Sequence, residues 1–253
     1  MTTRILIIGN GVIGSATGKA FEKYGLKVCY YDIDPDKRTV EEITTDYDLI
    51  FVCTPTPTID KQHFNNSVFS VLDTINTMFY KGIIVIKSTV LPGTCTTFAD
   101  AFPRLKIAHN PEFLTEANAA HDAQFPDTIF YSGANNKILE RVFSYFNCNI
   151  FYSPTYEDTE ILKYYKNTLL AMKVTIANQF YDLCEKHGAD YDSVREVLIN
   201  DKRIGESHLE VTEQRGYGGM CFPKDVQALL TQNPEMTLLQ AMTDYNKKIR
   251  KGE

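Results

Sequence analysis

The sequence predicts an α/β fold: a doubly wound parallel sheet followed by an all-helical domain built on one long linking helix. In residues 1–153, short apolar runs of strand length alternate with segments of helical periodicity. That alternation is typical of a parallel sheet covered by helices on both faces. From Thr155 to His187 the chain then shows one helical pattern without Pro or Gly. We therefore expect two domains, residues 1–153 and 154–253.

Composition excludes several classes of function. A chain of 253 residues with 43% hydrophobic content can bury one large core or two modest ones. The net charge of -6, without a basic stripe, argues against nucleic acid and against an anionic membrane surface. The longest apolar runs have strand length and are too short to span a bilayer. Six scattered cysteines without a C-x-x-C pair, and no secretory signal, lead us to expect a reduced, cytoplasmic protein without a metal site.

The expected elements follow in order from runs of apolar residues with period two or period 3.6. In the first domain we expect strands at 4–8, 27–31, 48–53, 82–87, 105–109, 125–130 and 149–152, and helices at 15–24, 68–80, 94–102 and 137–146. In the second domain the long helix ends at Gly188, a typical residue after a helix C-terminus. A helix over residues 190–198, a polar loop over 200–219 and two helices from Pro223 onwards complete the chain.

The first strand runs directly into a glycine-rich turn that predicts a dinucleotide site of the Rossmann type. In G-x-G-x-x-G, the first glycine makes the tight turn, the second admits the pyrophosphate, and the third lets helix and strand pack closely. Asp32 ends the second strand, about 20 residues on, where a ribose-binding carboxylate belongs. Asp34 adds a negative charge that would repel a 2′-phosphate, so we expect NAD rather than NADP. The expected contacts are Gly9, Asn10, Gly11, Val12, Ile13, Gly14 and Asp32.

Three polar loops follow strands of the predicted sheet. They comprise residues 54–57, 88–94 and 110–116. In such sheets, ligands bind at the carboxyl ends of the strands. Although each could be an ordinary connection, their common position predicts that some of them contact cofactor or substrate.

The segment Gly216–Asp225 crowds several kinds of chemistry together. Its glycines allow sharp turns and close approach to a ligand. Cys221 supplies a potential thiolate nucleophile, and Pro223 suits the first turn of a helix. Lys224 and Asp225 place a cation and a carboxylate within a turn of the sulfur. By itself the segment also fits a glycine loop that caps a helix beside an inert cysteine.

The long helix carries a second candidate group. Lys163 and Asn167 are four residues apart and therefore share a helical face. Alone, such a pair is more often a solvated Lys and a surface Asn. The broad apolar coverage of Thr155–His187 also predicts a homodimer formed largely through this helix.

Taken together, these motifs resemble the UDP-glucose/GDP-mannose dehydrogenase family of nucleotide-sugar 6-dehydrogenases. The resemblance runs in order along nearly the whole chain, and its most specific part is the closing cysteine motif with Lys163 and Asn167 upstream. The matching segments are 9–14, 54–57, 88–94, 110–116, 126–127, 163–167, 201–205 and 218–225.

The resemblance implies an NAD-dependent enzyme that oxidises a primary alcohol twice through a thiohemiacetal and a thioester. It implies that Cys221 is the nucleophile, that Lys163 and Asn167 face the oxyanion, and that Asp225 holds a water molecule. It also implies thioester hydrolysis by Glu116, with Thr89 and Glu112 positioning water and cofactor. The further implied cofactor contacts are Thr54, Pro55, Thr56, Ser88, Thr89, Glu116 and Lys224. The implied substrate contacts are Phe113, Leu114, Glu116, Lys163, Asn167, Tyr217, Gly218, Gly219 and Cys221.

The chain departs from the family pattern in three places. The second crossover after Asp32 is short, Ala117 stands where the family usually has Gly, and the sequence ends at Glu253 without the family's usual C-terminal nucleotide-binding domain. It is therefore read either as a natural minimal enzyme or as a fragment. Three functions stay open: a nucleotide-sugar dehydrogenase with UDP-glucose favoured, a β-hydroxyacid-type dehydrogenase that transfers one hydride, and a non-catalytic NAD-binding protein.

Overall fold

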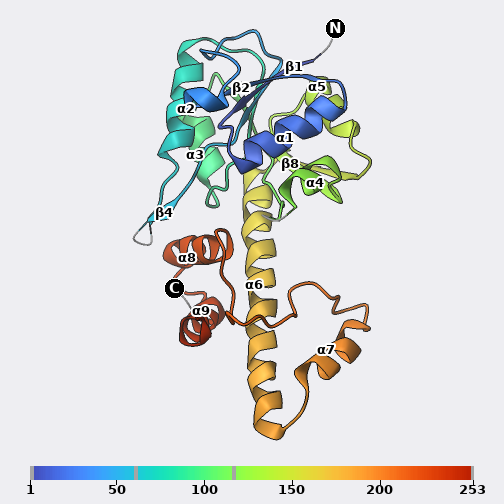
Figure 1. Cartoon of the computed structure of the whole chain (residues 1–253). Helices are drawn as coiled ribbons and strands as arrows, with labels where there is room; N and C mark the ends of the chain where they lie inside the picture. The colour runs from blue at the N-terminus through green and yellow to red at the C-terminus, as the bar shows by residue number, and fades with distance from the viewer. Residues whose placement is uncertain (1–2, 60–61, 116–117, 252–253) are drawn as a thin grey trace. The chain divides into compact units, whose positions relative to one another are not determined.

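The structure is a computed structural model that describes residues 3–59, 62–115 and 118–251. The chain divides into two compact units. Unit 1 consists of Met1–Pro57 and His63–Lys163, and unit 2 consists of Thr58–Gln62 and Tyr164–Glu253. Figure 1 shows the elements of both units in order along the chain.

Unit 1 is built on a seven-stranded sheet with the order β2-β1-β3-β6-β7-β8-β9. The strands are β1 (Arg4–Ile8), β2 (Lys27–Tyr31), β3 (Leu49–Val52), β6 (Ile83–Ile86), β7 (Lys106–His109), β8 (Thr128–Gly133) and β9 (Asn149–Ser153). In register, Ile8 lies between Tyr31 and Val52, so the strands end together at one edge. The glycine-rich turn and the polar loops after β3, β6 and β7 therefore follow strands that end at this edge.

Two strands, β8 and β9, run against the expected direction. All neighbouring strands are parallel except β7 and β8, which pair antiparallel through His109 and Ser132. Parallel strands need a crossover that returns the chain across the sheet. The described part of the connection from β7 to β8 contains only the six-residue helix α4 (Ala119–Gln124). The sheet is thus mostly rather than wholly parallel.

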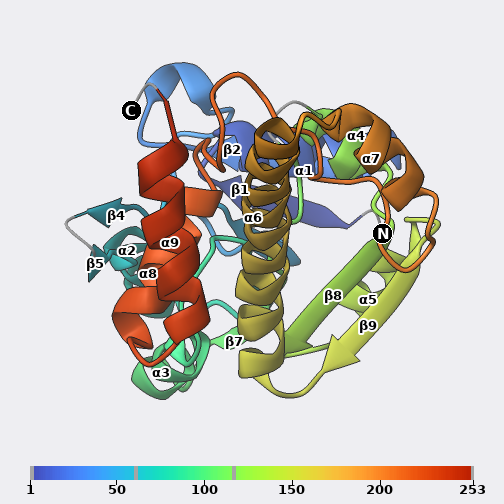
Figure 2. The same ribbon diagram turned by 90° about the horizontal axis from the view of Figure 1, so that it is seen from below.

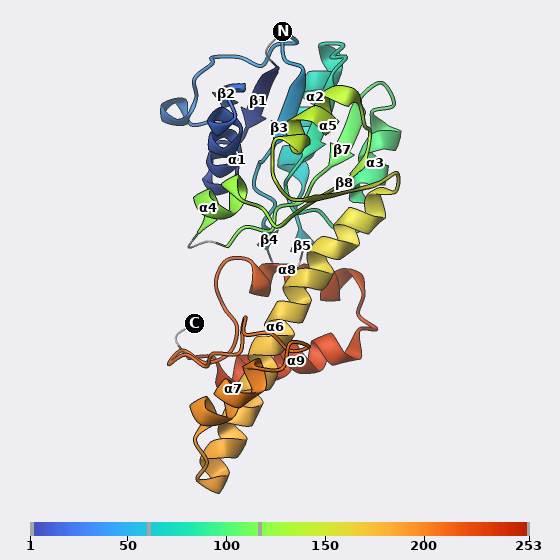
Figure 3. The ribbon, with the colours of Figure 1, turned by 90° about the vertical axis from the view of Figure 1, so that its right-hand side faces the viewer.

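Helices cover both faces of this sheet, as expected for a doubly wound fold (Figure 3). On one face, α1 (Val12–Lys23) and α5 (Lys137–Ser144) pack their buried apolar side chains against β1 and β3. On the other face, α2 (Asn66–Thr77) and α3 (Thr94–Ala101) pack against the alternate residues of the same strands. The strand side chains of the second cluster include Leu6, Ile8, Ile50, Val52, Ile84 and Ile86.

Unit 2 is mainly helical. The long helix α6 (Tyr156–His187) begins in unit 1 and continues through unit 2, and Gly188, with a φ of 69°, follows its last turn. The helices α7 (Tyr191–Ile199), α8 (Phe222–Gln232) and α9 (Thr237–Ile249) follow. α8 and α9 lie side by side (Figures 1 and 2).

The elements that the sequence predicted are present, with ends shifted by a few residues. The sequence patterns missed only short elements: the 3-10 turn η1 (Pro35–Lys37), α4, and a two-stranded sheet of β4 (Thr58–Ile59) and β5 (Gln62–His63). Across the described ranges, no helix has both the length and the apolar character needed to cross a membrane. The same ranges hold no group of three or more His, Cys, Asp or Glu side chains that could bind a metal ion.

Candidate functional site

The glycine-rich turn after β1 has the local geometry that a dinucleotide requires. Gly9 has a φ of +93°, and a Cβ there would lie 2.8 Å from the carbonyl oxygen of Cys53. A Cβ on Gly14 would lie 1.9 Å from the carbonyl oxygen of Gly9. Gly11, at the start of α1, has no heavy atom within 4 Å of an added Cβ. The turn therefore leaves open space at a helix N-terminus, where backbone N–H groups favour a phosphate.

Asp32 fixes this turn from the end of β2. Its Oδ2 accepts the backbone N–H of Asn10 at 2.6 Å, and its Oδ1 accepts the N–H of Asp34 at 2.9 Å. Asp34 forms an ion pair with Lys37 at 3.0 Å, and the bond to Lys37 lowers the pKa of the Asp34 carboxyl. The carboxylates of Asp32 and Asp34 thus differ in their surroundings, because the nearby Lys37 cation balances the negative charge of Asp34. These residues fit an NAD ribose and pyrophosphate.

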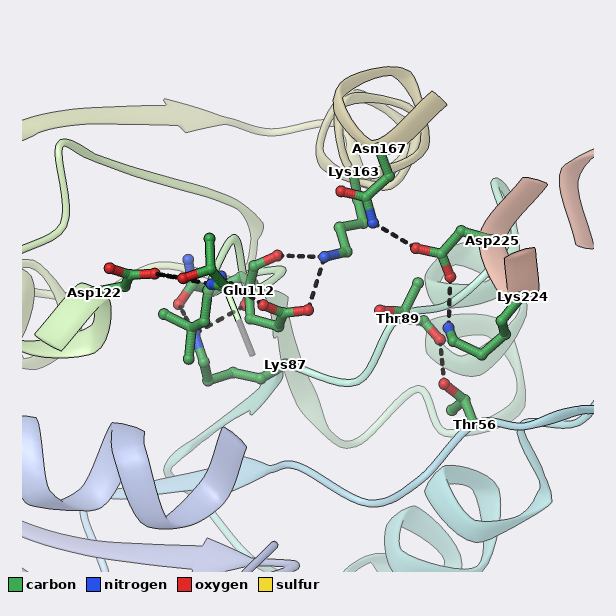
Figure 4. Close-up of polar contacts among 12 residues, drawn as sticks. Thr56, Lys87, Thr89, Glu112, Asp122, Lys163, Asn167, Lys224 and Asp225 are labelled. Atoms are coloured by element: carbon green, nitrogen blue, oxygen red, sulfur yellow. Dashed lines mark hydrogen bonds and ion pairs between the residues drawn. The ribbon is translucent and has the colours of Figure 1, made fainter. Parts of the chain in front are cut away.

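The loops after β3 and β6 are bonded to each other within unit 1 (Figure 4). The Thr56 hydroxyl donates to the carbonyl oxygen of Thr89 at 2.7 Å. The Ser88 hydroxyl donates to the carbonyl oxygen of Thr54 at 2.7 Å, and the Ser67 hydroxyl donates to that of Pro55 at 2.6 Å. The expected cofactor residues Thr54, Pro55, Thr56, Ser88 and Thr89 therefore belong to one connected pair of loops.

Sequence reasoning missed the residue that anchors the far end of the β6 loop. Glu160, in the second turn of α6, is fully buried, and its two carboxylate oxygens accept the N–H groups of Gly93 and Cys95, both at 2.7 Å. These N–H groups lie at the N-terminus of α3, where a negative charge is favoured. Burial raises the pKa of Glu160. A glutamate three residues before Lys163 was the signal available in the sequence.

Lys163 and Glu112 form a buried ion pair in unit 1 (Figure 4). Lys163 Nζ donates to Glu112 Oε1 and to the Glu112 carbonyl oxygen, both at 2.7 Å. The Lys163 and Glu112 side chains are 3% and 8% exposed, so the interpretation of Lys163 as a solvated surface lysine is wrong. Glu112 Oε2 also accepts the N–H of Leu114 at 2.7 Å, and Lys163 Nζ lies 5.5 Å from the Phe113 ring centroid.

Two further groups follow the same strands and were not predicted, the partly buried Lys87 and the buried His109. Lys87, after β6, donates to the Asn110 side-chain oxygen at 2.8 Å, and burial lowers its pKa. His109, at the end of β7, is fully buried, and its Nδ1 lies 2.7 Å from the Thr159 hydroxyl. Burial lowers the pKa of His109 to about 3. Lys87 thereby holds Asn110, the first residue of the loop after β7, and His109 contacts α6.

Unit 2 holds the thiol together with an amide and a carboxylate. Cys221 is half-buried at the N-cap of α8, with Pro223 in the first turn as expected. Asp225 is 1% exposed, and its backbone N–H donates to the Cys221 carbonyl oxygen at 3.0 Å. The Asn167 amide donates to Asp225 Oδ2 at 2.6 Å, and Lys224 pairs with the other oxygen (Figure 4). Asn167 is therefore a buried hydrogen-bond donor and not a surface residue.

The other residues named from the sequence differ in how they are placed. Tyr217 is 4% exposed and its hydroxyl lies 3.4 Å from that of Thr243, whereas Gly219, with a φ of +76°, faces open space. Glu116 lies outside the described residues. The structure brings together two groups: the glycine-rich turn, the polar loops and the Glu112–Lys163 pair in unit 1, and Asn167, Cys221, Lys224 and Asp225 in unit 2.

Family models match most of the chain. The NAD-binding domain of the UDP-glucose/GDP-mannose dehydrogenase family matches residues 37–147, and the central domain of that family matches residues 157–248. The UDP-glucose 6-dehydrogenase of Rickettsia conorii is 34% identical over 79% of this chain and 49% of its own length. The UDP-glucose 6-dehydrogenase AglM of Haloferax volcanii is 30% identical over 95% of this chain and 68% of its own length.

A solved structure agrees in fold. A UDP-glucose dehydrogenase from Pyrobaculum islandicum superposes with a TM-score of 0.85 at 24% identity, over 98% of this chain and 68% of the other. The chain thus spans about half the length of the Rickettsia relative and about two thirds of the archaeal ones.

Proposed function

The chain belongs to the UDP-glucose/GDP-mannose dehydrogenase family, and from this premise we propose that it oxidises a nucleotide sugar at C6 to the uronate. The observation that carries the proposal is the group around Cys221. A half-buried thiol, a buried carboxylate one turn later and the amide that binds this carboxylate lie in one unit. A dehydrogenase that transfers a single hydride has no use for the thiol.

In the proposed reaction Cys221 forms and breaks the covalent bond. After the first oxidation its thiolate adds to the aldehyde carbon and forms a thiohemiacetal. The second oxidation gives a thioester, and water then attacks the carbonyl carbon, releasing the carboxylic acid and the thiol. NAD, when bound, supplies the hydride acceptor for both oxidations.

Lys163 and Asn167 are proposed to donate hydrogen bonds to the substrate oxygen as it gains negative charge. Such preorganised donors act most strongly where water is excluded, and both side chains are buried. Their present partners, Glu112 and Asp225, hold them in defined positions. Asp225 is proposed to hold the water used in proton transfer, and Glu116 to assist thioester hydrolysis. Thr89 and Glu112 are proposed to position water and cofactor.

The proposed cofactor contacts combine the glycine-rich turn with the loops after β3 and β6. Gly9, Gly11 and Gly14 fit the pyrophosphate and Asp32 fits the ribose. Substrate contacts are proposed at the loop after β7, through Phe113 and Leu114, and at Gly218 and Gly219 before the thiol. UDP-glucose is the favoured sugar, because the relatives from Rickettsia and Haloferax are named for it.

We also propose that the protein is a cytoplasmic homodimer. Six large apolar side chains of α6 are between 43% and 64% exposed: Ile161, Tyr165, Leu169, Ile176, Phe180 and Leu183. A second copy packing on this helix would cover them. Light scattering at micromolar concentration should give twice the mass of 28.8 kDa, and a strictly monomeric mass contradicts this part of the proposal.

The decisive experiment compares the stoichiometry of NADH and acid. With saturating UDP-glucose and NAD, two NADH should form per uronate. Cys221→Ala should abolish acid production, by about 10³-fold or more in kcat. Cys148→Ala is the matched control, because Cys148 is another half-buried cysteine but lies in unit 1 directly before β9.

Other outcomes point to the alternatives. One NADH per product, or a wild-type rate in Cys221→Ala, contradicts the thioester scheme and favours the β-hydroxyacid reading. A β-hydroxyacid-type dehydrogenase would use the same two residues of α6, Lys163 and Asn167. Clean NAD binding without NADH from any nucleotide sugar favours a non-catalytic NAD-binding protein.

A further inference from the structure

The glycine loop before Cys221 is held by α9, the last helix of the chain. Asn246, in the last turn of α9, is 8% exposed, and its side-chain amide forms hydrogen bonds with both the N–H and the carbonyl oxygen of one residue. Its Oδ1 accepts the N–H of Tyr217 at 2.8 Å, and its Nδ2 donates to the carbonyl oxygen of Tyr217 at 2.9 Å. A side-chain amide that satisfies both polar groups of one residue fixes the main chain there in position and orientation.

Two more side chains hold the residues just before Tyr217. Asn178, on α6 and 1% exposed, accepts the N–H of Gly216 at 3.2 Å and the Arg215 Nε–H at 2.7 Å. Arg250, directly after α9, donates to the carbonyl oxygen of Arg215 at 3.0 Å. The loop is therefore attached to two helices of unit 2 by buried or half-buried polar contacts.

These contacts give a physical reason for two of the glycines. A Cβ on Gly216 would lie 2.3 Å from Asn246 Oδ1, and a Cβ on Gly218 would lie 2.1 Å from Arg250 Nη2. The space at these positions is filled by α9 and the residue that follows it. Gly219, in contrast, has open space around it. A side chain at Gly216 or Gly218 would therefore disturb the packing against α9 and Arg250.

We propose that Asn246 is a positioning residue that fixes Tyr217, and through it the main chain that carries Gly219 and Cys221. Only three residues separate Tyr217 from the thiol. The functional consequence of this positioning rests on the proposed chemistry of Cys221, but the positioning itself can be measured without turnover. The remaining contact at Tyr217, the hydroxyl near Thr243, holds the ring and not the peptide.

The test uses the full chain and two variants, Asn246→Ala and Asn246→Asp. Asn246→Asp keeps the acceptor for the Tyr217 N–H but replaces the donor to its carbonyl oxygen with an acceptor. Gln240→Ala is the control, because Gln240 is an exposed amide on α9 whose side chain bonds within the helix, to Asp244 at 2.9 Å.

Hydrogen exchange at Tyr217 is the first measurement. Two hydrogen bonds of about 1 kcal/mol each correspond to an exchange rate about 30-fold faster in Asn246→Ala. Asn246→Asp should also speed exchange, because its carboxylate faces the Tyr217 carbonyl oxygen, and Gln240→Ala should leave the rate unchanged. Amides of the α6 segment around Ala171 should keep their wild-type rates, which separates local release from global unfolding.

Thiol reactivity is the second measurement. Alkylation of Cys221 by iodoacetamide, followed by peptide mass spectrometry, should become about five-fold or more faster in Asn246→Ala because the loop opens more often. Cys184, buried in the same unit, is the internal reference and should not change. If the enzyme turns over UDP-glucose, kcat should fall at least ten-fold while the KM for NAD stays within about two-fold.

Wild-type exchange at Tyr217 and wild-type alkylation of Cys221 in Asn246→Ala would overturn the inference. If Asn246→Ala does not fold, the same two measurements on Asn246→Asp decide it. A wild-type chain without turnover would contradict the proposed function alone, since exchange and alkylation would still report on the loop.

Discussion

The two polar loops of unit 1 and the glycine loop of unit 2 are held by different chemistry. In unit 1, the loop after β6 ends on the Glu160 carboxylate, and the loop after β7 is fastened by the Glu112–Lys163 ion pair. In unit 2, the glycine loop is held by the neutral amides of Asn178 and Asn246, with the Arg250 guanidinium bonded to a backbone carbonyl oxygen before it.

The difference has energetic consequences. A buried charge that loses its partner costs far more than a neutral group that does, because desolvation is then uncompensated. Unit 1 should therefore respond strongly to loss of one charged partner and to pH. The glycine loop of unit 2 should respond mildly, and largely independently of pH, to the loss of either amide. The following predictions test this contrast, from the largest expected effect to the smallest.

The strongest test removes the cation of the buried pair. Lys163→Met leaves Glu112 buried without its partner, which should lower the free energy of unfolding by about 3–5 kcal/mol. Asn178→Ala in unit 2 should cost only about 2 kcal/mol, because it removes an uncharged acceptor from the Gly216 N–H and from the Arg215 guanidinium, which keeps its ion pair with Asp182. Urea denaturation followed by tyrosine fluorescence measures both.

The double variant Lys163→Met/Glu112→Gln should recover about half of the loss, since it removes the stranded charge. Equal costs for Lys163→Met and Asn178→Ala would break the contrast between the units. Lys163→Met should also lower kcat by about 10²–10³-fold if Lys163 is an oxyanion donor.

The second test concerns Glu160. Glu160→Ala leaves the N–H groups of Gly93 and Cys95 buried without acceptors, and should cost about 2–3 kcal/mol. Glu157→Ala is the matched control on the preceding turn, because Glu157 bonds to the exposed Thr96 hydroxyl and should cost less than about 1 kcal/mol. Thermal unfolding of the two variants, compared with wild type, measures the difference. A cost for Glu160→Ala no larger than that for Glu157→Ala contradicts a structural role for the buried carboxylate.

More of the backbone structure than of the side-chain contacts could be predicted from the sequence. The strands, helices and the glycine-rich turn followed from periodicity and local chemistry, because burial of one face imposes that pattern on the residues themselves. β8 and β9 were expected in the wrong direction, since strand direction depends on the path of the connection and not on the strands' own residues.

The supporting residues of the site were harder to predict. Glu160, Asn178 and Asn246 lie on helices where Glu and Asn are ordinary surface residues, and their partners are backbone groups far along the chain. A backbone N–H has no sequence signature, so contacts between side chain and main chain leave no spacing to detect. Lys163 and Asn167 were found only through resemblance, because the pair alone favoured a surface reading.

The third test uses pH. His109 is buried with its pKa lowered from 6.5 to about 3. Above pH 6.5 the imidazole is neutral in both states; below it the unfolded chain binds a proton that the folded chain does not. His109 should therefore contribute a loss of stability of about 1.4 kcal/mol per pH unit as the pH falls from 6.5 towards 3.

His109→Gln should flatten this part of the pH profile, measured by urea denaturation between pH 7 and pH 4. His208→Gln in unit 2 is the matched control. Burial also lowers the pKa of His208, but its ring is only partly buried, so its contribution to the slope should be smaller. Equal flattening by the two substitutions would remove the expected difference in acid sensitivity between the units.

The smallest effect concerns the carboxylate that both fixes a loop and is expected to bind the ribose. Asp32 accepts the N–H groups of Asn10 and Asp34, whereas Asp34 is balanced by Lys37. We therefore expect NAD selectivity to depend on Asp32 and hardly on Asp34. Asp32→Ala should weaken NAD binding by about ten-fold, about 1.4 kcal/mol, and narrow its advantage over NADP. Asp34→Ala should leave both affinities within about three-fold, because the Asp34–Lys37 pair is exposed and such pairs contribute little.

Asp32→Asn separates the two roles of Asp32. It keeps one side-chain oxygen for a loop N–H and removes the charge that repels a 2′-phosphate. If charge sets the selectivity, Asp32→Asn should improve NADP binding while NAD binding falls by less than in Asp32→Ala. If holding the loop is what matters, both cofactors should weaken together in Asp32→Ala and change little in Asp32→Asn. Isothermal titration of the three variants with NAD and NADP distinguishes these outcomes. Equal losses of NAD affinity in Asp32→Ala and Asp34→Ala would show that Lys37 does not screen Asp34 from the cofactor.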